Sequence, residues 1–171
     1  MTPDHQSPLD VVDELFIVEY NRFNLIDVAG PEPGDPDPSE SILFGADWVA
    51  AGPGWLALGS GGQDHLAAVR LEAWAGTPPD TEQNWERSTE VLVRFRSARV
   101  QLSRFTGGPS EHILRLPPGP DYRAQVHVRG RSRAAQAHLE TARTGELPSG
   151  LERWLLRIYA IPAQPSAPPQ P

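Results

Sequence analysis

The chain has 171 residues and a formal net charge of −7, and all fifteen of its basic residues are arginines. That length suits a single domain with a core of its own. Because cysteine and lysine are absent, the sequence excludes disulfides, thiolate metal sites, cysteine nucleophiles, Schiff-base lysines and the lysine of a P-loop.

The first residues, MTPDHQSPLDVV, contain neither a positively charged segment nor an apolar one. We therefore expect no signal peptide, and no apolar run approaches the length of a membrane span. The bias toward Arg, Ala, Gly and Pro is typical of a GC-rich genome. Together these features predict a bacterial, cytoplasmic protein that does not contact membrane.

The first half of the chain alternates strand-like segments with turns. LFIVEYNRFNLIDV (15–28) is rich in aromatic and β-branched residues, which predicts one long strand or two short ones. WLALGS (55–60) and LAAVRLEAW (66–74) are further strands, separated by the glycine-rich stretch GSGG, which we expect to be a hairpin turn. Trp74 falls on the polar face of its segment, opposite the apolar row. It is therefore our best candidate for an exposed, partner-facing tryptophan, or one covered by the acidic loop described below.

The second half repeats this pattern. Residues 131–146 lack strand alternation and predict one short helix near 134–142. The predicted strands are WERSTEVLVRFRSA (85–98), VQLSRF (100–105), HILRLP (112–117), DYRAQVHVRGR (121–131) and RWLLRIYAI (153–161). Short strands parted by Gly/Pro turns, almost without helix, indicate an all-β fold, an antiparallel two-sheet β-sandwich with at most one short helix. We expect one domain over residues 14–162, between a disordered N-terminus (1–13) and a disordered proline-rich tail (163–171).

Charge is distributed unevenly along the chain. Residues 1–50 hold eleven acidic residues and one arginine, a net charge of −10, whereas residues 51–171 hold eleven acidic and fourteen basic residues, a net charge of +3. The acidic loop, GPEPGDPDPSE (30–40), contains four prolines that forbid regular structure. Its carboxylates are candidate contacts for a basic protein partner: Glu32, Asp35, Asp37 and Glu40. Overall acidity argues against direct binding to nucleic acid.

Outward-facing arginines of the predicted strands suggest an alternative binding surface. Arginine pairs with carboxylates through two parallel hydrogen bonds, so an arginine row could bind an acidic partner or a ligand. The simpler interpretation is a solvated face whose arginines pair with Glu or Asp. The alternative ligand face consists of Trp74, Arg94, Arg96, Arg123, His127, Arg129 and Arg157.

No motif indicates catalysis or metal binding. Ser60, with Asp64 and His65 nearby, lacks the G-x-S-x-G context of a nucleophile elbow. The five histidines show no metal-ligand spacing, and the acidic loop lacks the glycine and ligand spacing of an EF-hand. We therefore expect no catalytic residues, no metal and no cofactor.

Four segments, taken in order, resemble the competence protein J family, small inhibitors of a bacterial DNA-entry nuclease. They are ELFIVEYNRFNLID, WVAAGPGWLALGSGGQDHLAAVRLEAW, WERSTEVLVRFRSARVQLSRF and ILRLPPGPDYRAQVHV, within residues 14–129. The stretch YRAQVHVRGR also resembles a recurrent element of uncharacterised actinobacterial proteins. The chain departs from the family in its acidic loop and after Arg129.

The resemblance implies a β-sandwich and a non-enzymatic, protein-binding function, that of a nuclease inhibitor or an immunity-type protein. An acidic surface can imitate phosphate at the positively charged groove of a nuclease. The rival interpretation is a sandwich domain that binds a small ligand or carbohydrate through the Arg/Trp face. No family binding motif maps onto particular residues of this chain.

Overall fold

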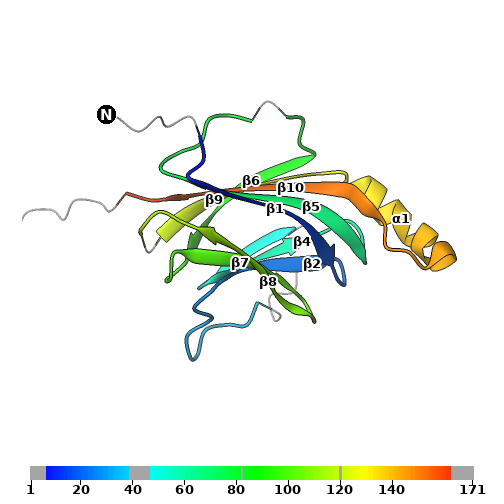
Figure 1. The fold of residues 1–171 in the computed structure, drawn as a ribbon, viewed down its shortest axis with the longest axis horizontal. Helices are drawn as coiled ribbons and strands as arrows, with labels where there is room; N and C mark the ends of the chain where they lie inside the picture. The colour runs from blue at the N-terminus through cyan, green and yellow to red at the C-terminus, as the bar shows by residue number, and fades with distance from the viewer. Residues whose placement is uncertain (1–6, 39–46, 82, 120, 163–171) are drawn as a thin grey trace, which may run out of the picture.

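The computed structural model describes residues 7–38, 47–81, 83–119 and 121–162, and over these residues the chain forms two five-stranded sheets packed face to face (Figure 1). Sheet A has the order β1-β5-β10-β9-β6, formed by Asp10–Val18, His65–Trp74, Ser149–Ala160, Asp121–Arg129 and Arg87–Arg94. Sheet B has the order β3-β4-β2-β7-β8, formed by Val49–Gly52, Trp55–Gly59, Arg22–Asp27, Arg99–Arg104 and Gly108–Arg115. The predicted β-sandwich is confirmed.

The core lies between the sheets and consists of the inward-facing half of each strand. Because successive side chains of a strand point to opposite faces, every second residue reaches this layer. Phe23 of sheet B packs edge-on against Trp154 of sheet A, with ring centroids 5.2 Å apart, and both side chains are buried. Burial of each large apolar side chain stabilises the fold by about 1.5–3 kcal/mol before the entropy cost is counted.

The N-terminal strands differ in detail from the prediction. The segment 15–28 forms two strands, β1 and β2, and β1 begins at Asp10, within the stretch expected to be disordered. Between them, Tyr20 and Asn21 both have positive φ, 54° and 64°, as a tight hairpin turn requires. Strand β3 was not predicted. It is a short edge strand of small residues whose register depends on its pairing with β4.

The stretch GSGG does not form a hairpin, contrary to the prediction. Strand β4 pairs with β2 and β3 in sheet B, whereas β5 pairs with β1 and β10 in sheet A. Residues 60–64 therefore carry the chain from one sheet to the other. Local turn chemistry cannot distinguish these two outcomes, because both need glycines.

Helix α1 (Arg131–Thr144) connects β9 to β10 and projects from one end of the sandwich (Figure 1). It confirms the single predicted helix, with ends a few residues beyond the expected ones. Strand β10 then returns antiparallel to β9 and parallel to β5. At the start of the helix, Gly130 has φ 88°, and a Cβ there would lie 1.9 Å from the carbonyl oxygen of Leu151. This tight approach of two backbones requires glycine.

Candidate functional site

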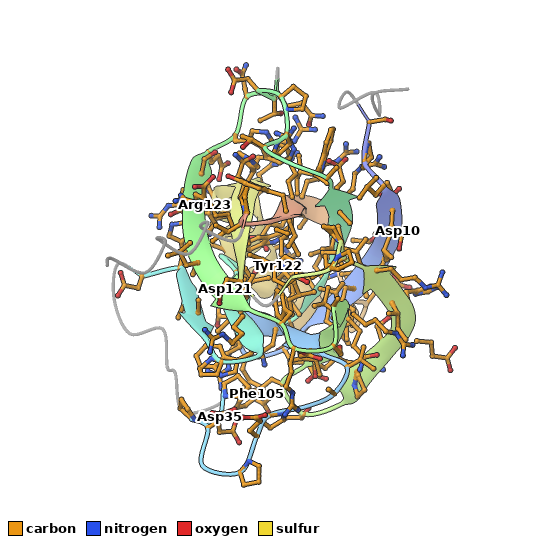
Figure 2. The ribbon with its side chains drawn as sticks, turned by 90° about the vertical axis from the view of Figure 1, so that its left-hand side faces the viewer. Asp10, Asp35, Phe105, Asp121, Tyr122 and Arg123 are labelled. Atoms are coloured by element: carbon orange, nitrogen blue, oxygen red, sulfur yellow. The ribbon has the colours of Figure 1, made fainter. Side chains whose placement is uncertain are left out.

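The acidic loop is fastened to the outer side of sheet B. The indole Nε1 of Trp55 donates to the carbonyl of Pro36 over 3.1 Å, and the carboxylate of Glu32 pairs with Arg96. Within the loop, the carboxylate of Asp35 accepts from the backbone N–H of Glu32 at 2.9 Å. Figure 2 places Asp35 beneath sheet B, away from the outer face of sheet A. Of the four predicted contacts, Glu32, Asp35 and Asp37 are thus placed, and Glu40 lies outside the described residues.

A hollow of about 360 Å³ lies between this loop and sheet B. Asp35 and Asp37 line its loop side, and Asn24, Trp55 and Phe105 line its sheet side. Asn24 is buried, and its Oδ1 has no hydrogen-bond partner among the described residues. The loop therefore presents carboxylates beside an aromatic and amide-lined recess, a combination of anchor and charge that suits a protein interface.

The predicted arginine row lies on the outer face of sheet A only in part. Strands β9 and β10 are neighbours, and Arg129 stands directly opposite Arg153. Two of the arginines pair with neighbouring carboxylates: Arg123 with Glu90 at 2.6 Å, and Arg94 with Asp121 at 3.0 Å.

Arg96 follows β6 and reaches across to the acidic loop instead, where Glu32 pairs with it. Arg96 therefore does not belong to the alternative ligand face, because its side chain contacts the acidic loop. Arg94, Arg96 and Arg123 are thus solvated side chains that pair with Asp or Glu, which is the simpler interpretation given by the sequence.

Trp74 is buried, contrary to the first of the two alternatives predicted for it, an exposed tryptophan. Its face of the sheet was predicted correctly, but only 5% of its surface is accessible. The guanidinium of Arg157 lies 5.2 Å from the centre of the Trp74 ring, and the Nε1 of Trp74 donates to Glu72 at 2.9 Å. Arg157 is itself buried, and it donates to the carbonyl of Pro79, in the connection between β5 and β6 that passes over sheet A (Figure 1).

The same connection buries His127 under Trp85. The two rings lie 5.5 Å apart, and the His127 Nδ1 is 2.8 Å from the hydroxyl of Ser88. Burial, with a smaller contribution from the positive charge of Arg157, lowers the pKa of His127 below its ordinary value. The guanidinium of Arg129 also lies over the ring of Trp85, 5.5 Å from its centre. Sequence reasoning missed Trp85 as part of this face, because the strand predicted over 85–98 gives Trp85 the same parity as the inward Val91 and Val93, whereas β6 begins only at Arg87.

A buried carboxylate, also missed, joins the two sheets near α1. Glu152 of β10 is fully buried, and its carboxylate accepts from the Ser60 hydroxyl at 2.6 Å, the Gly61 N–H at 2.9 Å and the Trp154 Nε1–H at 3.0 Å. Burial alone would raise the pKa of Glu152, but hydrogen bonds from His65 and these three donors outweigh it and hold the pKa below its ordinary value. The sequence did contain a signal, since Glu152 shares the inward face with Trp154.

This cluster of serine, histidine and carboxylate does not have the geometry of a catalytic triad. Ser60 directs its hydroxyl proton to the Glu152 carboxylate at 2.6 Å, and the Nε2 of His65 lies 2.8 Å from the same serine oxygen. In a serine nucleophile the hydroxyl donates to histidine. Ser60 and His65 are also buried, at 5% and 1% exposure, and cannot meet a substrate.

Two further properties of the described part of the chain concern metal binding and membrane spans. No group of three or more His, Cys, Asp or Glu side chains there is arranged to hold a metal ion. Within the same residues, no helix is both long and apolar enough to cross a membrane.

Comparisons with known proteins bear on the fold. No protein-family model matches the chain, and no curated protein matches it. A solved structure of ComJ, inhibitor of the DNA degrading activity of NucA, from Bacillus subtilis, is 12% identical, with 90% of this chain and 98% of that chain covered and a TM-score of 0.59. A structure described as crocagin biosynthetic gene J is 15% identical, with 88% and 96% covered and a TM-score of 0.56. The resemblance to the competence protein J family inferred from the sequence is thus confirmed at the level of the fold.

Proposed function

We propose that the protein is a non-enzymatic inhibitor that binds a basic protein partner, a nuclease or the toxin of an immunity pair, through the acidic loop. The observation that carries this proposal is the attachment of the loop at two points, to Trp55 of β4 in sheet B and to Arg96, which follows β6. A loop held in place loses less conformational entropy on binding than a free one. Its carboxylates therefore act as a fixed anionic surface, with Glu32 and Asp37 exposed to a partner.

Two further observations support this function over catalysis. The serine and histidine that invited comparison with an active site are buried and oriented for structure, as described above. The structure of ComJ, which shares the fold, is that of an inhibitor of a DNA-degrading activity. Fold alone does not determine function, so the acidic surface must supply the specificity.

The test compares three forms of the protein: wild type, the variant Glu32→Gln/Asp35→Asn/Asp37→Asn, and the control Arg94→Gln/Arg123→Gln. The protein is immobilised, a basic partner is recovered from host lysate, and the purified partner is assayed for DNA degradation with each form added. We expect wild type and the control to abolish degradation. Neutralising the loop should reduce the association rate about tenfold at low salt, because steering between opposite charges is lost.

The loop variant removes the exposed ion pair Glu32–Arg96 and the control removes two pairs, each worth about 0–1 kcal/mol, so stability should be comparable across the forms. Raising the ionic strength should slow the association of wild type toward that of the loop variant. An inhibitor that works equally well without the three carboxylates would refute the acidic loop as the contact. A recovered partner that leaves DNA degradation untouched, or none at all, would refute the inhibitor function.

A further inference from the structure

A groove of about 380 Å³ crosses the outer face of sheet A, on the opposite side of the sandwich from the acidic loop. It forms where Ala68 of β5 stands between Leu15 of β1 and Arg153 of β10, its neighbours in register. The small alanine leaves a depression between two longer side chains. Trp85 and Leu155 complete the apolar lining, and Leu15 leaves 58% of its surface open to solvent.

The charged groups around the groove are balanced except for one. Arg70 binds Asp13 and Glu72, each at 2.7 Å. Glu14 accepts from Ser110 at 2.7 Å, toward the interior edge of the sandwich. Arg153, by contrast, has no hydrogen-bond or ion-pair partner among the described residues, although it lines the groove.

A second arginine adds to this local positive charge. Arg129 lies directly opposite Arg153 on the neighbouring strand and likewise has no carboxylate partner in the described part of the chain. Like charges at facing positions of a sheet destabilise it, and an anion between them would reverse that effect. Farther along the same face, Arg123 and Arg94 do have carboxylate partners, so the unpaired positive charge is local to the groove.

The wall of the groove is already fixed. Trp85 donates from Nε1 to the hydroxyl of Thr81 at 3.0 Å, and His127 and Arg129 pack against its ring. Because this aromatic surface is already ordered, ligand binding would not carry the entropy cost of ordering it. The volume falls within the range typical of small-molecule sites.

We propose that this groove binds a small apolar carboxylate. The apolar body lies over Leu15, Ala68 and the ring of Trp85, and the carboxylate pairs with Arg153, beside the positive charge of Arg129 on the neighbouring strand. Guanidinium groups match a carboxylate better than they match a neutral polar group. The site is independent of the proposed inhibitor function, because it shares no residue with the acidic loop.

The test uses two probes that differ only in charge, 4-phenylbutyrate and 4-phenylbutyramide. Each is titrated into ¹⁵N-labelled protein while backbone and indole N–H signals are followed by NMR. We expect shifts at Ala68, Leu155 and the Trp85 indole, with the carboxylate binding about tenfold more tightly than the amide, the difference that one charge-assisted pair typically makes. A short peptide ending in phenylalanine, with a free or amidated C-terminus, tests whether the carboxylate comes from a chain end instead of a free acid.

Two variants and a control locate the binding. Arg153→Gln alters an exposed side chain and should bring the affinities for carboxylate and amide together, whereas Ala68→Leu should fill the groove and weaken both probes. Arg94→Gln, an exposed arginine on the same face but outside the groove, should change neither. Equal affinity for the two probes in wild type, or shifts confined to residues away from the groove, would overturn the proposal, as would no binding of any probe at millimolar concentration.

Discussion

Replacing the buried Glu152 by Gln should be among the most damaging conservative substitutions in this protein. The carboxylate accepts hydrogen bonds from the buried Ser60 and Trp154 at Oε2 and from the partly buried Gly61 N–H at Oε1, and the His65 Nε2 lies 3.4 Å from Oε2. Glutamine offers one acceptor oxygen and one donor group in the same volume. If its oxygen keeps the bonds of Ser60 and Trp154, its amide N–H groups face the N–H of Gly61.

The magnitude follows from this count. Loss of one hydrogen bond to a charged group costs roughly 1.5–3 kcal/mol, and the two remaining bonds weaken by about 1 kcal/mol each when the charge is removed. The positive charge of Arg131, whose Nε lies 3.9 Å from Oε1, also loses its counter-charge. We therefore expect the free energy of unfolding to fall by about 3–5 kcal/mol, a large part of the 5–15 kcal/mol of a typical domain.

The pH dependence gives a second, independent signature. Because the pKa of Glu152 is lower in the folded protein than its ordinary value, ionised Glu152 contributes stability that is fully present above the unfolded value, about pH 4.3. That contribution is lost as the pH falls through the folded pKa. The difference in unfolding free energy between wild type and Glu152→Gln should therefore be constant near neutral pH and shrink below about pH 4.

Urea unfolding at pH 7 and at a series of acidic pH values measures both quantities. The matched control is Glu111→Gln, an exposed carboxylate on β8, for which we expect a change within about 0.5 kcal/mol. If Glu152→Gln costs less than about 1 kcal/mol at neutral pH, or if its cost grows as the pH falls, the carboxylate does not act as a buried ionised acceptor.

Three further substitutions test other parts of the fold. Gly130→Ala should lower the unfolding free energy, measured by thermal unfolding, by more than about 3 kcal/mol, because its Cβ would lie 1.9 Å from a carbonyl oxygen. The control Gly34→Ala has φ 92° but open space around its Cβ, and should cost only about 1 kcal/mol. Equal costs for the two variants would contradict this prediction. Asp27→Ala should cost about 2–3 kcal/mol in urea unfolding, because Asp27 accepts from the backbone N–H groups of Ala29 and Ser97; a neutral result would show that water replaces it. Trp85→Ala should speed hydrogen exchange in the connection between β5 and β6 while the core strands stay protected, and unchanged exchange would show that Trp85 does not hold the connection.

The strands and their faces could be predicted because alternation is a local signal. The outward positions of Arg70 and Trp74, and of Arg123 and Arg157, follow from a period of two alone, and the structure has them so. The solvent exposure of these outward side chains could not be predicted from the alternation. Whether an outward side chain meets water depends on what folds over it, and the connection that covers Trp74 and Arg157 docks through contacts distant in sequence.

Pairing between distant strands was equally beyond local reasoning. The parallel register of β5 with β10 and the crossing of residues 60–64 between the sheets depend on tertiary contacts. The acidic loop was identified by composition, but its attachment through Trp55 could not be, because a single indole hydrogen bond leaves no pattern in the sequence. The groove was missed for a related reason. An alanine flanked by long side chains is ordinary until three strands bring the residues together.

The acidic loop and the groove lie on opposite outer faces of a close-packed sandwich, so the basic partner and the carboxylate should bind independently. Direct electrostatic effects between the two sites are screened beyond about 10 Å at 0.1 M salt. Coupling of their affinities would require the sheets to move relative to each other, since allostery needs two states that both sites bias. The Glu152 network opposes such movement, because it joins Ser60, at the end of β4 in sheet B, to β10 in sheet A through buried hydrogen bonds. If the carboxylate does alter partner binding, that network is therefore where the two sheets would have to separate, and Glu152→Gln should change the coupling as well as the stability.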